Sequence, residues 1–438
     1  MNAVPQLRLA YYGDDFTGST DALEQLTRAG LRTRLFLDPP SRDRLAGTPG
    51  LQAVGVAGLS RSLDPAAMER TLLPAFAALR VLGPRHVHYK VCSTFDSAPH
   101  IGSIGKAIDV GLEVFGGRFV PLVVGAPALG RYCVFGHLFA RFGIGSAGEI
   151  HRLDRHPAMR RHPVTPADEA DLRLHLARQT SRPIGLVDML QLARPLAETE
   201  AALRRLVADG VEIVLFDALD ESHLARIGAL LERTAEAGPL FSVGSSGIET
   251  ALGVHWAAEG AATARRDWPA VGPVERLLVV SGSCSPVTTG QIEWAQANGF
   301  SVLSLDPAEP AVEATVAAAR REIDAGRSVV VCTSRGPSEG PAVPARVVGT
   351  ALGRIARGVV EATGLRRVVV AGGDTSSYAG RALGLEAVEM LAPFVPGAPW
   401  CLACAPDGVV QGLEINFKGG QVGAPDYFGA ARRGSASP

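Results

Sequence analysis

Short runs rich in β-branched residues alternate with longer helical patterns along nearly the whole of this 438-residue chain. The first apolar run, at 7–12, precedes a helical pattern at 18–29, and similar pairs recur up to the run at 367–371. When helices connect successive strands, each helix returns the chain to the same end of the sheet, so the strands lie parallel. The pattern therefore predicts an α/β fold.

The alternation stops at 258–274, where apolar periodicity is lost, small residues gather and two prolines occur. Such a segment is typical of a linker, and a chain of this length exceeds one simple core. We therefore expect two domains, each a mostly parallel sheet flanked by helices. The boundaries place an N-terminal domain at 1–260, a linker at 261–274 and a C-terminal domain at 275–438. A second irregular stretch, 144–166, is expected to form a long loop in the first domain.

Composition narrows the class of protein. Hydrophobic residues make up 47% and charged residues 20% of the chain, as in soluble globular proteins, and the formal net charge is −1. This charge argues against a nucleic-acid binder that works through bulk charge. No apolar run approaches the ~18 residues of a membrane-spanning helix, and no apolar signal core opens the chain. The scattered cysteines predict reduced thiols in a cytoplasm, and packing is favoured over a metal or redox role for Cys401 and Cys404.

Three turns rich in Gly, Ser and Thr follow apolar runs of the second domain, at 281–286, 372–377 and 418–423. Backbone N–H groups in such turns, with a helix N-terminus behind them, can bind phosphate. Each turn alone could equally be a helix cap or an exposed β-turn. Together they favour one phosphate-bearing ligand. Neither GxxxxGK[ST] nor GxGxxG occurs in them, which lowers support for a P-loop or a dinucleotide site.

Charged and hydroxyl side chains follow three apolar runs of the first domain. Asp14 and Asp15 end the first run, at the edge where parallel sheets bind ligands, although one of them could simply cap a helix. Lys90 ends another run and is followed by hydroxyl side chains, so it could hold a carboxylate or phosphate. Arg131, after a third run, has the planar fork that suits a carboxylate. The histidines at 144–166 match no standard zinc spacing, so no metal site is expected from protein side chains.

Seven segments in this order resemble the four-carbon acid sugar kinase family, long catalogued as a domain of unknown function. They are YYGDDFTGSTDAL, KVCSTFDSAPHIGSIG, APALGRY, SVGSSGIE, SGSCSPVTTGQI, GGDTSSYAGRALG and FKGGQVG. The resemblance covers nearly the whole chain. Members phosphorylate threonate, erythronate or 3-oxo-tetronate at the terminal hydroxyl. It implies that the N-terminal domain binds a small sugar acid and the C-terminal domain binds ATP, with Mg²⁺ bridging the phosphates.

The resemblance also assigns residues. The expected substrate-side positions are Asp14, Asp15, Lys90, Ser93, Thr94 and Arg131. The expected nucleotide-side positions are Ser283, Ser285, Gly372, Gly373, Asp374, Thr375, Ser376, Gly420 and Gly423. Asp15 and Asp374 are the two candidates for accepting the hydroxyl proton, and Lys90 or Arg131 would hold the substrate carboxylate.

One segment departs from the family pattern. Many relatives carry Asp-Ser-Thr-Leu-Arg-Gly after the lysine, whereas this chain has Cys-Ser-Thr-Phe-Asp-Ser at 92–97. The acid is therefore left open at this point, as is the oligomeric state, with a homodimer as one option. Two other functions compete with a kinase: a non-catalytic sensor of a nucleotide or sugar acid, and an NAD-dependent oxidoreductase of hydroxy acids. The second lacks the glycine fingerprint of NAD binding.

Overall fold

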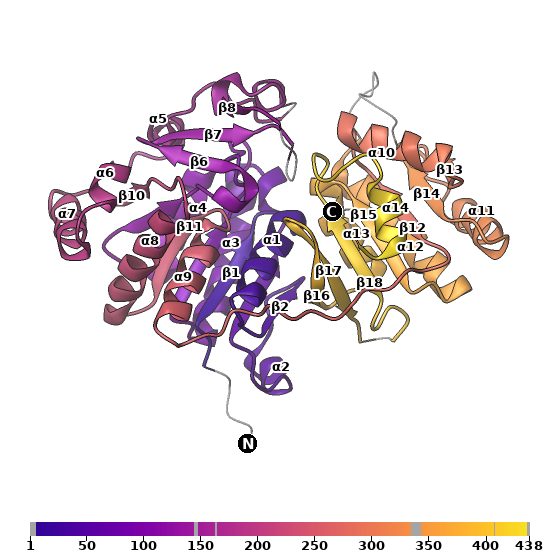
Figure 1. Cartoon of the computed structure of the whole chain (residues 1–438), viewed down its shortest axis with the longest axis horizontal. Coiled ribbons are helices and arrows are strands. Elements are labelled where there is room, and N and C mark those ends of the chain that lie inside the picture. Colours follow the sequence, from indigo (N-terminus) through magenta and orange to yellow (C-terminus); the bar gives the residue numbers. More distant parts are fainter. Residues whose placement is uncertain (1–5, 144–147, 163, 334–342, 407, 436–438) are drawn as a thin grey trace.

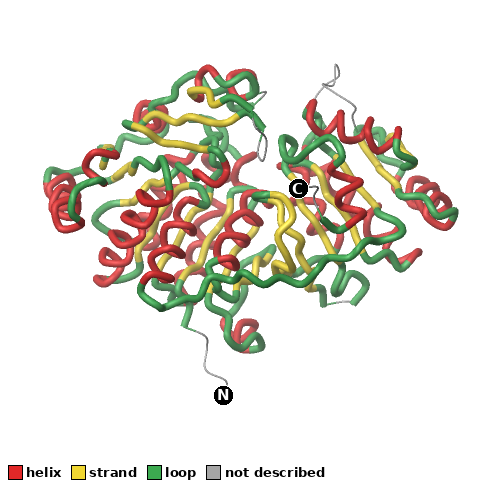
Figure 2. The backbone as a smooth tube through the Cα atoms, in the orientation of Figure 1, coloured by secondary structure: helices red, strands yellow, loops and turns green. Residues whose placement is uncertain are grey.

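The computed structural model describes residues 6–143, 148–162, 164–333, 343–406 and 408–435. The N-terminal residues, coloured indigo to magenta, form one lobe, and the C-terminal residues, orange to yellow, form the other (Figure 1). Helices cover the strands of both lobes (Figure 2). Strand β1 shows why, because Leu9 and Tyr11 enter one hydrophobic core while Ala10 and Tyr12 enter another on the opposite face. The predicted α/β fold is confirmed.

The first lobe is built on parallel strands. In sheet order these are β2 (Thr33–Phe36), β3 (Ala53–Ala57), β1 (Leu9–Gly13), β4 (His86–Lys90), β11 (Leu240–Gly244), β5 (Val120–Val123), β10 (Ile213–Phe216) and β9 (Ile184–Val187). Its helices are α1 (Phe16–Arg28), α2 (Arg42–Ala46), α3 (Pro65–Leu82), α4 (Ile104–Phe115), α5 (Leu172–Ala177), α6 (Met189–Leu192), α7 (Leu196–Ala208), α8 (Glu221–Thr234) and α9 (Gly247–Ala258).

The second lobe has five parallel strands and an antiparallel pair. In sheet order these are β13 (Ser301–Ser304), β14 (Val329–Cys332), β12 (Leu278–Ser281), β15 (Arg367–Ala371) and β18 (Glu414–Lys418), then the antiparallel β17 (Ala398–Cys404) and β16 (Ala387–Val395). Its helices are α10 (Pro286–Ala297), α11 (Val312–Asp324), α12 (Ala345–Thr363), α13 (Gly373–Leu383) and α14 (Tyr427–Arg433). Each lobe thus carries the mostly parallel, helix-flanked sheet that the sequence predicts.

The two sheets join edge to edge, which the sequence analysis did not anticipate. Strand β16 of the second lobe pairs antiparallel with β2 of the first, with Ala387 opposite Phe36 and Val388 opposite Leu35. The result is one sheet of 15 strands through both lobes. Within the described 164–333, residues 259–277 contain no helix or strand and run as a coil from α9 to β12 (Figure 1).

The long loop predicted at 144–166 is wrong in its described part. This part contains β8 (Ile150–Arg152) and two short 3-10 helices, η3 (Leu153–Arg155) and η4 (Met159–Arg161). Strand β8 extends the antiparallel hairpin of β6 (Arg131–Val134) and β7 (His137–Arg141) into a separate small sheet. Residues 144–147 and 163 lie outside the described chain. Its histidines serve the backbone: Nδ1 of His156 accepts hydrogen bonds from the N–H groups of Ala158 and Met159.

Candidate active site

Asp14, Asp15 and Lys90 lie together at the carboxyl ends of neighbouring strands of the large sheet, whereas Arg131 begins β6 of the small sheet. Gly13, Lys90 and Gly244 are the last residues of three neighbouring parallel strands and are in register with one another. The N–H of Asp14 donates to the Lys90 carbonyl at 2.9 Å, which holds the two chain segments together just beyond the strands. Asp14, Asp15 and Lys90 are each at least 97% buried, at 3%, 2% and 1% exposed. The strand-end positions read from the sequence therefore converge.

Arg61 neutralises the paired aspartates. Its guanidinium donates to both oxygens of Asp14, at 3.1 and 2.8 Å, and to Oδ2 of Asp15 at 2.7 Å. Burial raises the pKa of Asp14 to about 6, although the Arg61 charge opposes the shift. Sequence reasoning missed Arg61, because it lies in η1 (Ser60–Ser62), a turn too short for a periodic signal.

Asp15 has a second role as the N-cap of α1. Its Oδ1 accepts the N–H of Gly18 at 2.7 Å, and its Oδ2 accepts the hydroxyl of Thr17 at 2.7 Å. The cap considered in the sequence analysis is therefore present, and it coexists with the Arg61 pair. A carboxylate offers about four lone-pair sites, so three contacts leave acceptor capacity on Oδ1.

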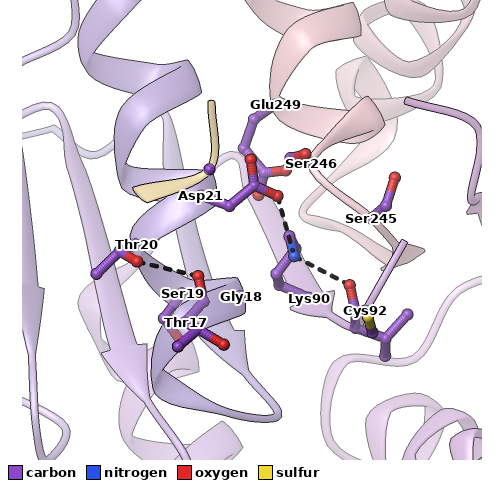
Figure 3. Close-up of polar contacts among 12 residues, drawn as sticks. Thr17, Gly18, Ser19, Thr20, Asp21, Lys90, Cys92, Ser245, Ser246 and Glu249 are labelled. Carbon is purple, nitrogen blue, oxygen red and sulfur yellow. Dashed lines mark hydrogen bonds and ion pairs between the residues drawn. The ribbon is translucent and has the colours of Figure 1, made fainter. Parts of the chain in front are cut away.

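Lys90 is held by an acidic partner that sequence reasoning missed. Its ammonium lies 3.4 Å from the Asp21 carboxylate. Figure 3 shows Ser246 and Glu249, from the start of α9, beside that carboxylate. The ammonium also donates to the Val91 carbonyl at 3.0 Å. Burial works against the Lys90 charge, but the Asp21 and Glu249 carboxylates outweigh it and raise the Lys90 pKa. A carboxylate on the buried face of the predicted helix was the available signal for Asp21.

Within the described chain, the guanidinium group of Arg131 is held by hydrogen bonds on one side only. Its Nη1 donates to the carbonyls of Leu129, Gly130 and Arg141, at 3.1, 3.3 and 3.0 Å. Its Nε is buried and has no partner among the described residues, and the side chain as a whole is 94% buried, at 6% exposed. Burial lowers the Arg131 pKa. The pinned Nη1 therefore leaves the Nε–Nη2 edge, which is the edge that grips a carboxylate with two hydrogen bonds.

The segment that departs from the family pattern is folded tightly. Ser93 and Thr94 are buried, and the Thr94 hydroxyl lies 2.9 Å from the Cys92 sulfur. Burial raises the pKa of the Cys92 thiol to about 12, so the thiol is neutral near pH 7. Phe95 has a φ of +57°, which is unusual for a residue with a side chain. Strain of this kind is often found at binding sites.

The three Gly/Ser/Thr turns of the second lobe lie against one another. A Cβ added to Gly282 would lie 2.9 Å from Oγ1 of Thr375, and one added to Gly420 would lie 2.8 Å from Oγ of Ser283. These glycines are therefore required for the close approach of the turns. Ser285 caps α10 by accepting the Val287 N–H, whereas no described side chain caps α13. The N-terminus of α13 is thus the more open anion site.

The remaining nucleotide-side residues contribute differently. Gly372 has a φ of +139°, and Ser376 donates from its hydroxyl to the Gly372 carbonyl. Gly423 packs on the ring of Tyr427, where an added Cβ would be only 2.1 Å from a ring carbon, so its part in nucleotide binding stays a prediction. The side chain of Asp374 lies outside the described part of the structure.

The two halves meet where α1 and α13 begin. A Cβ on Gly373 would lie 3.7 Å from Oδ2 of Asp15. The next residues lock the contact: the N–H of Phe16 donates to Oγ of Ser377 at 3.0 Å, and the Phe16 and Phe417 rings stack with centroids 4.0 Å apart. A carboxylate between a cluster of buried polar side chains and an uncapped helix N-terminus suits phosphoryl transfer, which needs positioning and charge balance more than covalent help.

Comparison with known proteins decides the family. A sugar-binding N-terminal domain family matches residues 9–252, and a nucleotide-binding C-terminal domain family matches residues 278–428. The chain belongs to the four-carbon acid sugar kinase family. It is therefore a phosphotransferase with an alcohol group as acceptor, and the sensor and oxidoreductase alternatives lose their basis.

Relatives in this kinase family span the full chain. A 3-oxo-isoapionate kinase of Paraburkholderia graminis is 45% identical over 98% of this chain and 94% of its own length. A 3-oxo-tetronate kinase of Methylobacterium radiotolerans is 36% identical over 97% of this chain and 98% of its own. A solved structure from Salmonella typhimurium has a TM-score of 0.76 at 26% identity and covers 98% of this chain and 99% of that one.

The described residues were also compared with the requirements of a membrane-spanning helix and of a metal site. None of their helices is long and apolar enough to span a bilayer. They also contain no group of three or more His, Cys, Asp or Glu side chains placed to hold a metal ion.

Proposed function

We propose that the chain transfers the γ-phosphoryl group of ATP to the terminal hydroxyl of a 3-oxo sugar acid. The observation that carries the proposal is Asp15, a buried carboxylate that lies between the sugar-acid lobe and the N-terminus of α13. The acids expected from the sequence were threonate, erythronate and 3-oxo-tetronate. The names of the relatives with 45% and 36% identity favour the 3-oxo acids and make 3-oxo-isoapionate the first to test.

Arg131 is the proposed grip on the substrate carboxylate. Lys90, the other candidate, already faces Asp21 and donates to a backbone carbonyl. In Arg131, Nη1 is held by hydrogen bonds to backbone carbonyls. The Nε on its other edge has no partner among the described residues, so that edge can bind a carboxylate. A carboxylate on that edge would satisfy the buried Nε and gain two charge-assisted hydrogen bonds.

Asp15 is the proposed proton acceptor. It faces the α13 N-terminus, where the γ-phosphate of ATP would be held, and its Oδ1 keeps acceptor capacity. Arg61 pairs with the Asp15 carboxylate at 2.7 Å and supplies a countercharge to it. Asp374 starts the same helix and stays the second candidate for this role.

The three turns of the second lobe are the proposed nucleotide site, through Ser283, Gly372, Thr375 and Gly420. Mg²⁺ in kinases is commonly held by one or two carboxylates together with substrate phosphates, so a site without three clustered protein ligands fits the ion. The bound ion would supply charge neutralisation at the β- and γ-phosphates.

Cellular context is part of the proposal. The buried Cys133 and Cys401 are free thiols, which agrees with the reducing cytoplasm where ATP is available. A homodimer stays a prediction, and its test is the mass of the protein in solution.

The test is ADP release in the presence of ATP, Mg²⁺ and single acids: 3-oxo-isoapionate, 3-oxo-tetronate, threonate and erythronate. We expect turnover with a 3-oxo acid and a loss of about 10²–10⁴-fold in Asp15→Asn, which keeps the side-chain shape but removes the proton acceptor. Asp168→Asn, an exposed carboxylate paired with Arg178, is the matched control and should match the wild type. ADP release with none of the acids would overturn the proposal.

A further inference from the structure

Strand β18 ends in a buried lysine that has no acidic partner among the described residues. Lys418 is 0% exposed, and its Nζ donates to Oγ1 of Thr288 at 3.0 Å. Its other neighbour is the Tyr427 ring, whose centroid is 5.5 Å from Nζ. Buried ammonium groups normally have a carboxylate nearby, as Lys90 has in Asp21. Lys418 therefore needs another explanation.

Lys418 begins the third turn of the nucleotide lobe, contacts the second turn and reaches the helix that follows the first. Its carbonyl accepts the N–H of Gly372 at 2.9 Å, immediately before α13. Its ammonium reaches Thr288 in the first turn of α10, and the Thr288 hydroxyl donates to the Gly420 carbonyl at 2.9 Å. One side chain and one carbonyl thus join the turns that follow β12, β15 and β18.

The surroundings disfavour a positive charge while the site is free of phosphate. The first turn of α10 carries the partial positive charge of a helix N-terminus. Burial lowers the pKa of Lys418 to about 7. Among the described residues packed against it, α10 contributes the neutral Thr288, β15 contributes backbone, and α14 contributes Tyr427, whose own pKa burial raises. Among the described residues no carboxylate pairs with the ammonium, and the Tyr427 ring is its aromatic contact.

Phosphate groups at the three turns would reverse this balance. They would place negative charge at the N-termini of α10 and α13, next to the lysine, and so favour its protonated form. We propose that Lys418 is the positioning residue of the nucleotide site: it holds the three turns together and takes up a proton when the nucleotide binds. The inference rests on the proposed nucleotide site, because it requires phosphates at these turns.

The experiment is calorimetric titration of the full-length protein with ADP and Mg²⁺ in two buffers of different ionisation enthalpy. The difference in measured heat gives the protons taken up per ADP. From a pKa of about 7, we expect an uptake of ~0.9 proton at pH 8 and ~0.1 proton at pH 6, after subtraction of the Lys418→Met result. Lys418→Met removes the proton site and keeps the stem, so it corrects for protons released by ADP itself.

The KM values of Lys418→Met and of one further variant, Thr288→Val, separate positioning from folding. Lys418→Met should raise the KM for ATP about tenfold and leave the KM for the sugar acid unchanged, because the acid site is in the other lobe. Thr288→Val keeps the amine but breaks its link to the Gly420 turn, so it should raise the KM for ATP while proton uptake persists. A purely structural lysine would change stability and move neither proton uptake nor its pH dependence.

The outcomes are distinct. Equal proton uptake in the wild type and Lys418→Met would overturn the inference and leave the proposed function standing. If Lys418→Met does not fold, the wild-type uptake at pH 6 and pH 8 decides alone, and an uptake that does not rise with pH overturns the inference. If the wild type binds no ADP under any condition, the proposed function itself fails.

Discussion

Asp15 and Gly373 face each other across the boundary between the lobes, with a carboxylate oxygen 3.7 Å from where a Cβ of Gly373 would lie. Each is at the start of a helix, Asp15 before α1 and Gly373 as the first residue of α13. Their contact brings the carboxylate of one lobe to the anion-binding end of a helix in the other. The consequences of this arrangement can be tested one residue at a time.

Gly372 and Gly373 are neighbours at this boundary, but substitution by alanine should affect protein stability at Gly372 and not at Gly373. Gly372 has a φ of +139°, and an added Cβ would be 2.4 Å from Oγ1 of Thr375, so Gly372→Ala should cost about 1–3 kcal/mol and raise the KM for ATP. Gly373 has ordinary space at 3.7 Å, so Gly373→Ala is the matched control for stability and should unfold close to the wild-type temperature. Thermal unfolding and the KM for ATP measure both. Greater damage from Gly373→Ala would contradict the geometry.

Removing Arg61 should destabilise the protein more at high pH than at low pH. Arg61→Met leaves Asp14 and Asp15 buried without a countercharge, at a cost of about 3–5 kcal/mol. Burial raises the Asp14 pKa, so the folded state binds the proton more tightly than the unfolded chain. Lowering the pH therefore protonates Asp14 and reduces the loss in the free energy of unfolding that Arg61→Met causes. Urea unfolding at pH 5 and pH 8 measures this. Arg204→Met, on the exposed face of α7, is the control, and equal losses at both pH values would refute the argument.

Activity should rise with pH through a step near pH 6. The pKa of Asp14 is raised to about 6 by burial, and its ionised form is the one that orients Arg61 against Asp15. Below that pH Asp14 is neutral and no longer pairs with Arg61 as an ion, so Arg61 is held less firmly against Asp15. The kcat/KM for the sugar acid therefore falls. Asp14→Asn should abolish the step. A pH profile of kcat/KM checks the prediction, and an unchanged step in Asp14→Asn would assign it to another group.

Arg131→Lys should weaken the sugar acid and spare the nucleotide. Lysine keeps the charge but cannot present the planar Nε–Nη2 edge that holds a carboxylate with two hydrogen bonds. We expect the KM for the acid to rise about 10- to 100-fold, with the KM for ATP unchanged. Arg178→Lys, an exposed pair with Asp168, serves as the control. A change in the KM for ATP alone would move Arg131 out of the acid site.

The sequence predicted the parallel strands well because their residues are buried on both faces. Strand β15, Arg367–Ala371, was visible as an apolar run at 367–371. The hairpin of β16 and β17 was not predicted, because three prolines at 393, 396 and 399 indicate turns rather than strands. The pairing of β16 with β2 joins residues about 350 positions apart, which local patterns do not encode.

Among the site residues, those with a local sequence signal were predicted and those that depend on distant contacts were not. Asp14, Asp15 and Lys90 were found because they end strands, where the position itself carries the signal. Arg61 and Asp21 were missed because their roles depend on partners brought close by folding. The boundary of the domains near 261–274 stays a prediction.

The continuous sheet sets how the lobes can move. A hinge at the 259–277 coil would require the lobes to separate. Antiparallel pairing of β2 with β16, with Phe36 opposite Ala387 and Leu35 opposite Val388, holds them together. Ion pairs of Arg34 with Glu389 and Arg44 with Glu386 flank that seam. A relative motion of the lobes that keeps this pairing would be a twist about the seam, and it would have to keep or break the contact of Phe16 with Ser377 between α1 and α13. The coil then acts as a tether, and lengthening it would leave the axis of motion unchanged.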